Sequence, residues 1–391
     1  MTETIRLGLL RLTDAAPLVA AQELGLFHAL GLSVDLSVEP SWANLADKLA
    51  VGLLEGAVLL PPLAIAATLG LRGPAVSLLV PGGISLGGNT IALAPALADP
   101  ALDGNPAPLA VGARLRAAIA RQGRRPVLAV VHGYSTHHLL LRYWLAASGI
   151  DPERDVMLTV LPPAAMVAAV EAGRIDGFCA GAPWGGMAAQ AGTGRIVLGT
   201  ANIWRNHPEK CLAVRADWAA TAPERLHALL RGLLRAGRLC DDPAEADGLA
   251  RLLARPDYLS VPAEMVRASL PSAGTQDDPL RSVFAAHAAT FPWRSHARWF
   301  AGQMARWGMM AEDDATRSRV AAIYRPDLHE AAARAEDWSV PWMNQKVEGG
   351  HPSEWMLPAS PAPIPMRADA FCDGALFDEK TGNMVSFAQI R

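Results

Sequence analysis

The sequence predicts an α/β protein built as two lobes. The chain has 391 residues, which exceeds the length of one ordinary compact unit. Hydrophobic residues make up 51% of it, enough to fill two cores. Over the first 200 residues short apolar runs alternate with helical patterns, as in βαβ units. After about residue 215 the patterns become mainly helical.

The first 200 residues contain eight runs that predict strands: Ile5–Leu10, Ser33–Ser37, Gly56–Leu60, Val76–Val80, Thr90–Leu93, Val127–Val131, Asp155–Val160 and Arg195–Leu198. Helices are predicted between them at Ala16–Leu24, Leu45–Leu54, Thr136–Ala147 and Ala164–Ala172. A further strand is predicted at Cys211–Val214. Right-handed crossovers predict parallel sheets, which bind ligands at the carboxyl ends of their strands.

The later part of the chain carries apolar stripes at helical spacing. Glu224–Leu239 and His296–Met310 each present one such face, and Pro262 can open a helix between them. We interpret these stripes as core surfaces. Ser339–Met366 holds six prolines and predicts an irregular surface segment, followed by a short turn at Phe371–Phe377.

Charge and cysteine patterns exclude several classes of function. The net charge is −3 and no Lys/Arg block is present, so direct nucleic-acid binding is not expected. The four cysteines are far apart and suggest reduced, buried thiols rather than zinc ligands or disulfides. The N-terminus leads into the first strand without a signal-peptide pattern, and no uncharged run reaches the roughly 18 residues of a membrane span. These features predict a cytoplasmic protein that does not bind a membrane.

One segment is suited to an anion. Gly133–His138 lies between the strand Val127–Val131 and the helix that follows. Such a junction directs free backbone N–H groups toward one point. Ser135, Thr136 and His137 add side-chain donors there. Simple capping of the helix by Ser or Thr is the alternative interpretation.

Two further residues could contribute to an anion site. The indole N–H of Trp42 can only donate a hydrogen bond, although a single Trp usually lies in a core. Lys210, directly before an apolar strand, could supply positive charge, or it could be a surface lysine. The glycine-rich stretch Gly82–Asn89 is interpreted as a turn and not as a phosphate loop. No nucleophile elbow, metal motif or cofactor motif is present, so no cofactor is expected.

Several segments in order resemble the nitrate- and bicarbonate-binding proteins of the NrtA/CmpA type. They are Leu12–Leu18 with Gly25–Phe27, Ser41–Ala50 with Leu54–Ala57, Ser135–His137 with Leu141–Leu145, Gly173–Cys179 with Ala182–Trp184, and His207–Lys210. The resemblance covers roughly residues 5–326. It implies a type II periplasmic-binding-protein fold, with two α/β lobes joined by two crossovers and a mainly helical C-terminal part.

The family resemblance also implies domain bounds and ligand contacts. Residues 1–90 and 210–338 would form the first lobe, residues 91–209 the second, and residues 339–391 a Pro-rich segment packed on the first lobe. Family anion contacts fall on Trp42, Asn89, Thr136, His137, Pro183 and Lys210. Asn89 replaces a Gln that is frequent in nitrate transporters.

The same resemblance limits which anion the protein is expected to bind and which biological role it is expected to have. In the bicarbonate-binding relatives, calcium and acidic residues help to hold the ligand. This sequence offers Lys210 instead, which favours nitrate or nitrite.

The missing export signal points to the cytoplasmic NasS-like branch, a nitrate/nitrite sensor that holds a NasT-like RNA-binding antiterminator until the anion binds. The alternatives are a solute-binding subunit of an ABC importer for nitrate, bicarbonate or alkylsulfonate, or, less in keeping with the sequence, an enzyme. A pyrimidine synthase of this fold carries a clustered cysteine motif that is absent here.

Overall fold

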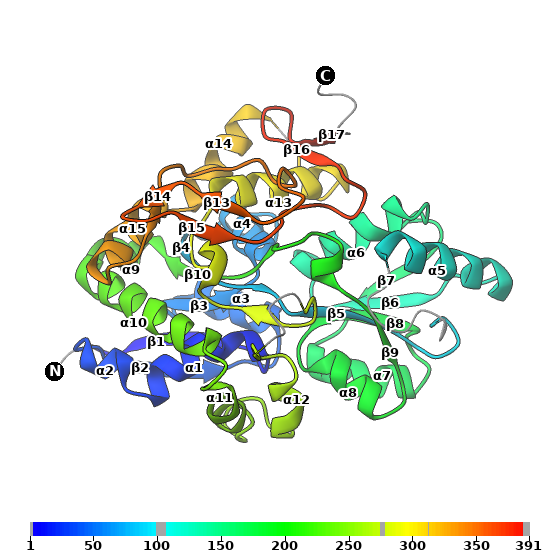
Figure 1. Ribbon diagram of the computed structural model, residues 1–391, viewed down its shortest axis with the longest axis horizontal. Coiled ribbons are helices and arrows are strands. Elements are labelled where there is room, and N and C mark those ends of the chain that lie inside the picture. Colours follow the sequence, from blue (N-terminus) through cyan, green and yellow to red (C-terminus); the bar gives the residue numbers. More distant parts are fainter. Residues whose placement is uncertain (1–2, 99–106, 274–277, 312, 386–391) are drawn as a thin grey trace.

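The strands of the computed structural model form two main sheets, which Figure 1 shows on opposite sides of the molecule. The structure describes residues 3–98, 107–273, 278–311 and 313–385. The first sheet runs in the order β11 (Ser282–Val283), β4 (Leu78–Gly87), β10 (Pro208–Arg215), β3 (Gly56–Leu59), β1 (Ile5–Leu9) and β2 (Val34–Val38). The second runs β7 (Met157–Val160), β6 (Val127–Val130), β8 (Gly177–Gly181), β5 (Asn89–Leu93) and β9 (Arg195–Gly199). We call the parts built on these sheets the first and second lobe.

Both sheets are mixed, so the prediction of parallel sheets was wrong. β1 is parallel to β2 and β3, and β6 is parallel to β7 and β8. However, β10 is antiparallel to β3 and β4, and β5 is antiparallel to β8 and β9. β5 and β10 are the strands that follow the two crossovers between the lobes. Each enters its new sheet against the direction of the parallel strands, which a βαβ pattern does not reveal.

The glycine-rich stretch Gly82–Asn89 is a strand and a crossover rather than a turn. β4 continues through Gly82 and Gly83 to Gly87, so it is longer than the predicted Val76–Val80. A Cβ on Gly83 would lie 2.2 Å from the backbone oxygen of Ala289, so glycine allows a close approach there. Gly87 and Gly88 have φ values of +62° and +82°, a conformation that favours glycine. The chain enters the second lobe through these two residues.

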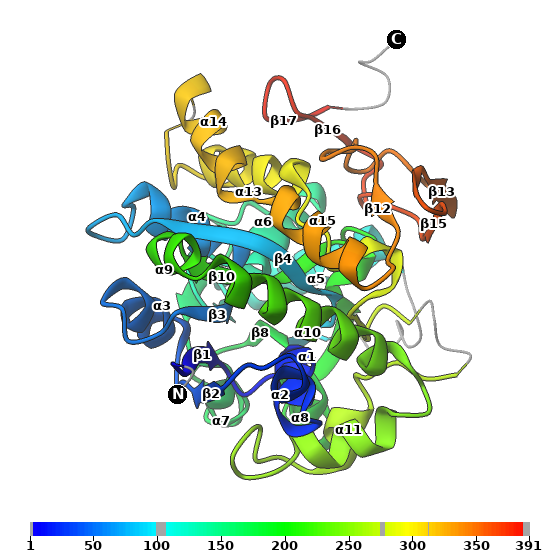
Figure 2. The same cartoon turned by 90° about the vertical axis from the view of Figure 1, so that its left-hand side faces the viewer.

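Helices cover both sheets. Those of the first lobe are η1 (Thr13–Ala15), α1 (Ala16–Glu23), α2 (Leu26–Ala29), α3 (Trp42–Ala50), α4 (Pro61–Leu69), α9 (Ala216–Thr221), α10 (Pro223–Asp241), α11 (Ala246–Leu253), α12 (Ala263–Arg267), η5 (Ala286–Ala288), α13 (Arg294–Arg306), α14 (Asp314–Ile323) and α15 (Pro326–Ala335). Those of the second are α5 (Pro108–Gln122), α6 (Thr136–Ala147), η3 (Pro163–Ala165), α7 (Met166–Glu171), α8 (Trp184–Gln190) and η4 (Thr200–Asn202). Figure 2 shows α10 running beside α1 and α15, and it packs on both.

Some elements match the sequence predictions and others do not. The helix Thr136–Ala147 is confirmed at both ends, and Ser135 caps its first turn. The helix predicted from Leu45 begins earlier, at Trp42, with Ser41 as its cap. No helix was predicted at Pro61–Leu69, but prolines fit the first turn of a helix, and Pro61 and Pro62 open α4. β8 was not predicted, since its sequence Gly-Phe-Cys-Ala-Gly is rich in small residues.

The C-terminal part is more ordered than an irregular surface segment. Three short antiparallel pairs are present: β12 (Val340–Pro341) with β14 (Ala359–Ser360), β13 (Trp355–Leu357) with β15 (Ile364–Met366), and β16 (Leu376–Asp378) with β17 (Asn383–Val385). Phe371 is buried and stacks on Trp204, with ring centroids 4.8 Å apart. Prolines conceal the pairing in the sequence because they disrupt the alternation typical of strands.

One hydrophobic cluster extends across both lobes, and a second lies within the first lobe. Trp42 and Leu59 of the first lobe belong to the same buried cluster as Leu128 and Phe178 of the second. α13 packs on both α4 and α6, one helix from each lobe. Among the described residues, no helix is both long and apolar enough to cross a membrane.

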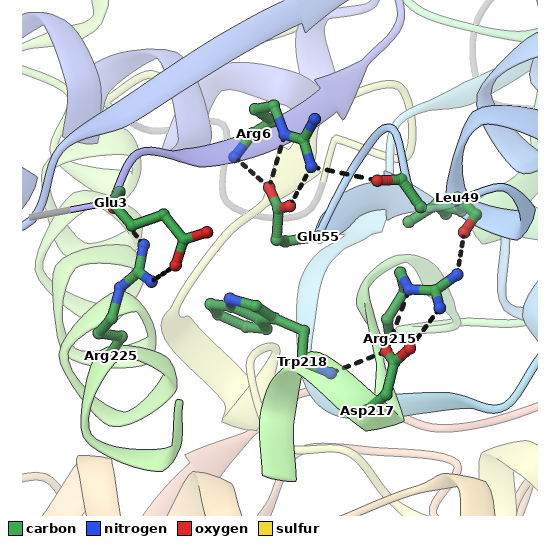
Figure 3. A network of polar contacts seen from close by, with 9 residues as sticks. Glu3, Arg6, Leu49, Glu55, Arg215, Asp217, Trp218 and Arg225 are labelled. Atoms are coloured by element: carbon green, nitrogen blue, oxygen red, sulfur yellow. Dashed lines mark hydrogen bonds and ion pairs between the residues drawn. The ribbon is translucent and has the colours of Figure 1, made fainter. Parts of the chain in front are cut away.

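The amino ends of the parallel strands in the first lobe carry a network of charged side chains (Figure 3). Arg6, on β1, pairs with Glu55, which lies directly before β3. Arg215, at the end of β10, pairs with Asp217 and donates to the Leu49 carbonyl over 2.8 Å. The Arg6 side chain is 43% exposed, so water screens these pairs. This edge is solvated, and the opposite edge of the same sheet differs from it sharply.

Candidate functional site

The candidate residues lie where the carboxyl edges of the two sheets face each other. Trp42 follows β2, and Lys210 lies near the start of the antiparallel β10, beside the end of β4. Asn89 pairs with Gly181 at the carboxyl end of β8, and Pro183 follows two residues later. His137 is in the first turn of α6, which follows β6. Both lobes therefore contribute side chains to one region.

Lys210 is the charged centre of this region. Its side chain is fully buried. Nζ lies 2.8 Å from Asp14 Oδ2 and 2.7 Å from Glu209 Oε1. It also lies 5.5 Å from the centre of the Trp42 ring, within range of a cation–π interaction. Lys210 is therefore held between two carboxylates and over an aromatic face.

Burial and charge shift the pKa values of these groups in a consistent way. Burial lowers the pKa of Lys210, but Asp14 and Glu209 outweigh it, so the pKa is raised and the ammonium stays charged. Burial raises the pKa of Glu209 to about 6, although Lys210 and, to a smaller extent, the Asn89 amide limit the rise. Burial holds the pKa of His137 well below its usual range, and Lys210 adds to this effect. His137 is neutral at physiological pH.

A set of buried polar atoms converges here without hydrogen-bond partners among the described residues. They are Trp42 Nε1, both amide atoms of Asn89, both ring nitrogens of His137 and Glu209 Oε2. His137 Nδ1 lies 3.6 Å from Glu209 Oε1, too far for a good hydrogen bond. Leaving one such group unsatisfied costs about 1–3 kcal/mol. A concentration of them at one point indicates a place where a ligand or ordered water completes the bonding.

The polar side chains at the start of α6 have different roles: some stabilise the fold, and one remains available for a ligand. Ser135 caps the helix: its Oγ accepts from His138 N at 3.1 Å and donates to the His132 carbonyl at 2.7 Å. Its hydroxyl is thus committed to the capping role that the sequence offered as an alternative. Thr136 Oγ1 donates to the Glu209 carbonyl at 3.4 Å, a contact between the lobes. His137 is left with its imidazole free.

Asn89 and Pro183 are placed by neighbouring strands of the second lobe. Ala182 N donates to the Gly88 carbonyl at 3.1 Å, and Thr13 N donates to the Ala182 carbonyl at 2.9 Å. The segment before Pro183 is thereby tied to η1 of the first lobe, which carries Asp14. Pro183 is buried at the start of α8. Its own part in ligand binding remains a prediction.

Two acidic members of the site, Asp14 and Glu209, were missed as site residues. Asp14 was noted only within the segment Leu12–Leu18, and Glu209 only as part of His207–Lys210. The view that Lys210 stands in place of acidic residues was therefore incorrect, because two carboxylates neutralise it. An acidic residue within the apolar stretch after the first strand was the signal for Asp14. Within the described ranges, no group of three or more His, Cys, Asp or Glu is arranged to hold a metal ion.

Two lobes joined by two crossovers, with polar side chains from both meeting between them, define a two-lobed binding-protein fold. The NMT1-like family model matches residues 1–254. The chain is 33% identical to the nitrate/nitrite binding protein NrtA of Synechococcus elongatus, over 85% of this chain and 77% of that protein. The chain therefore belongs to the NMT1-like family, and the predicted resemblance to NrtA-type proteins is confirmed.

Other relatives are larger proteins. The chain is 37% identical to the nitrate import ATP-binding protein NrtC of Synechococcus elongatus over 85% of its own length. It is 38% identical to the bicarbonate transport ATP-binding protein CmpC of the same organism over 78% of its length. The chain spans about half the length of NrtC and less than half that of CmpC, 50% and 45%.

Solved structures give the same fold. The periplasmic nitrate-binding protein NrtA of Synechocystis PCC 6803 matches with a TM-score of 0.83 and 28% identity, covering 97% of this chain and 96% of NrtA. The alkanesulfonate-binding protein SsuA of Xanthomonas axonopodis matches with a TM-score of 0.58 and 17% identity, over 82% and 97% of the two chains. The predicted type II periplasmic-binding-protein fold is confirmed. The NrtA and SsuA structures are both named as binding proteins.

Proposed function

We propose that this protein binds nitrate or nitrite between its lobes and does not catalyse a reaction. The observation that supports this most strongly is the convergence of unpartnered donors from both lobes beside the Lys210 ammonium. Trp42 Nε1 belongs to the first lobe, whereas Asn89 Nδ2 and an N–H of His137 belong to the second. Removing an oxyanion from water is costly unless several donors and positive charge replace its hydration.

The identity of the anion is supported by the relatives. Proteins 33% and 30% identical to this chain are named nitrate/nitrite binding proteins. Small planar oxyanions suit a site in which donors approach from several directions. We propose Trp42, Asn89, Thr136, His137, Pro183 and Lys210 as the contacts, with Asp14 and Glu209 holding Lys210.

Two neighbouring residues of β5 provide a matched test. Asn89→Leu keeps a side chain of similar shape but removes the donor amide. Thr90→Val removes a hydroxyl that is also buried and unpartnered, on the opposite face of the same strand, where it lies against Gly185. Calorimetric titration of ligand-free protein with nitrate, nitrite, bicarbonate plus calcium, and chloride should show nitrate or nitrite binding in the wild type and in Thr90→Val. Asn89→Leu should bind at least about tenfold more weakly, the loss of about 1.4 kcal/mol. Equal affinity in both variants would rule out the proposed site.

We further propose that binding is read out by a partner. A ligand held by side chains of both lobes favours the closed form, and a partner that binds the other form is then released. A NasT-like RNA-binding antiterminator in the cytoplasm is the partner we propose, so that the anion controls nitrate assimilation genes. Pull-down of the antiterminator by this protein should weaken with nitrate or nitrite and not with chloride. Retention that saturating anion leaves unchanged would refute the sensor role.

A role in import is the second candidate. Two kinds of relative support it. NrtC, of which the chain matches half, is named a nitrate import protein, and NrtA, named a nitrate/nitrite binding protein, is matched over most of this chain. A solute-binding subunit of an ABC importer for nitrate, bicarbonate or alkylsulfonate would use the same buried site. Fractionation of cells that produce the natural gene product separates the two roles, since a sensor is found with the cytoplasm and an importer subunit outside it or with the membrane.

A further inference from the structure

Glu209 has one carboxyl oxygen that the protein leaves without a partner. Oε1 lies 2.7 Å from Lys210 Nζ, whereas Oε2 is buried and makes no hydrogen bond to any described residue. The Glu209 carboxyl lies beside the Asn89 amide, which lowers its pKa, and beside the unpartnered imidazole of His137, whose Nδ1 is 3.6 Å from Oε1. Any anion bound by these donors therefore lies close to Oε2.

The groups around Glu209 cannot neutralise it as an anion binds. Lys210 Nζ is shared between Glu209 and Asp14 of η1. His137 of α6 is buried and neutral, and Cys179 of β8 is buried with its pKa raised well above the usual range, so it carries no charge. Asn89 of β5 is neutral. With both carboxylates ionised the cluster carries one net negative charge before any anion enters.

His207, which precedes β10, also faces Glu209 but cannot protonate it readily. Its Nδ1 lies 3.9 Å from Oε2 and is already hydrogen-bonded to the Pro208 carbonyl at 3.0 Å. Because a carbonyl only accepts, Nδ1 carries the proton, and Nε2 accepts from the Thr200 hydroxyl at 2.8 Å. Both nitrogens of His207 are thus occupied in the neutral form. Burial lowers the pKa of His207 to about 4.

Nitrate and nitrite offer only acceptor oxygens, and so does an ionised carboxylate. An anion beside Oε2 therefore meets repulsion unless a proton lies between them. We infer that Glu209 binds the oxyanion as its neutral acid, with the Oε2 hydroxyl donating to the ligand. Each anion bound is then accompanied by one proton. This inference rests on the proposed function and extends it, because the anion binds together with a proton.

The proton makes anion affinity depend on pH. Burial already raises the pKa of Glu209 to about 6, so the cost of protonation is small near that pH. Above it, the affinity for nitrate or nitrite falls by about tenfold per pH unit, because one proton is taken up per anion. Below it, the affinity levels off. The site would thus respond to the anion and to acidity together.

Calorimetric titration from about pH 5.5 to about pH 8.5 tests this inference, with each pH measured in two buffers of different ionisation enthalpy. We expect the wild type to take up close to one proton per nitrate or nitrite above about pH 7, with the tenfold slope. Glu209→Gln places an amide donor where the acid would place its hydroxyl. This variant should bind with the same affinity across the range and take up no proton.

Glu348→Gln is the matched control. Glu348 is a second buried glutamate beside a buried lysine, and its pKa is raised to about 8, so it titrates in the same range outside this site. The control should keep the slope. Binding by the wild type without proton uptake would refute the inference and leave the proposed function intact, and so would uptake that persists in Glu209→Gln. Absence of nitrate and nitrite binding by both proteins at every pH would instead refute the proposed function.

Discussion

Two buried lysines in this molecule are each paired with two carboxylates, yet the two clusters have different roles. Lys210 pairs with Asp14 and Glu209, and Lys346 pairs with Glu348 and Asp369. Burial lowers the pKa of both lysines, and the paired carboxylates outweigh it and raise each pKa above its ordinary value. By charge alone the two clusters are equivalent.

The difference lies in the remaining hydrogen bonds. Around Lys346, Ser295 Oγ donates to Glu348 at 2.6 Å, while Trp204 Nε1 and Gly349 N donate to Asp369 at 2.8 and 3.0 Å. Every member of the Lys346 trio is thus bonded by the protein itself. An unpartnered imidazole lies beside each cluster, His137 near Glu209 and His296 near Glu348, but only around Lys210 do a carboxylate oxygen, Glu209 Oε2, and an amide, that of Asn89, also lack such partners. A saturated cluster holds the C-terminal segment in place, whereas an unsaturated one is suited to a ligand.

Removing each lysine is expected to give the largest effects. Lys210→Met and Lys346→Met both leave two carboxylates buried without their cation, at a cost of about 3–5 kcal/mol in the free energy of unfolding. Only Lys210→Met should abolish stabilisation by nitrate or nitrite. Urea unfolding with and without the anion measures both quantities. If Lys346→Met also lost the stabilisation, the division between a structural and a ligand-binding cluster would be wrong.

Replacing the glutamate of each cluster should change the free energy of unfolding over a different pH range, and by less than replacing the lysine. The folded-state pKa of Glu209, about 6, lies above its ordinary value of 4.5. Its stabilising contribution is therefore present below pH 4.5 and is lost as the pH rises through 6, about 2 kcal/mol in all. Glu209→Gln should be more stable than the wild type by this amount near neutral pH, without ligand, and equal to it in acid.

For Glu348 the folded-state pKa is about 8, so the loss of stability extends to that pH. The free energy of unfolding, measured at a series of pH values, should fall over two pH ranges. Glu209→Gln should remove the fall that ends near pH 6, and Glu348→Gln the fall that extends to about pH 8. An identical pH profile in both variants would contradict the assignment.

Asn89→Leu should raise stability while it weakens binding. Both amide atoms of Asn89 are buried without hydrogen bonds, so an apolar residue of similar shape relieves a cost of about 1 kcal/mol. Thermal unfolding without ligand should therefore occur at a higher temperature than in the wild type. A variant destabilised by this change would mean that the amide bonds to the protein after all.

The smallest effect is expected at the solvated edge shown in Figure 3. Arg215→Ala removes a pair with Asp217, whose side chain is 63% exposed. Because exposed pairs contribute little, the loss should stay below about 1 kcal/mol, with unchanged anion affinity. A large loss of affinity would show that this edge is coupled to the site.

The sequence predicted the parts of the fold that depend on local pattern. The capped helix after Ser135 and the strands of Ile5–Leu9 and Val127–Val130 were found because apolar runs and a cap are local signals. The reversed direction of β5 and β10 was not found, since it depends on how the chain crosses between lobes. Asp14 and Glu209 were missed for the same reason. Only the antiparallel entry of β10 brings Lys210 beside the loop after β1, about 200 residues earlier in the chain.

The central claim is that the unpartnered donors between the lobes bind an oxyanion. The most direct test is the free energy of unfolding of the ligand-free wild type near pH 6, with nitrate or nitrite against chloride. At about a hundred times its dissociation constant, a bound anion should add about 2.7 kcal/mol, and chloride should add nothing. Equal stability in nitrate, nitrite and chloride would contradict the claim.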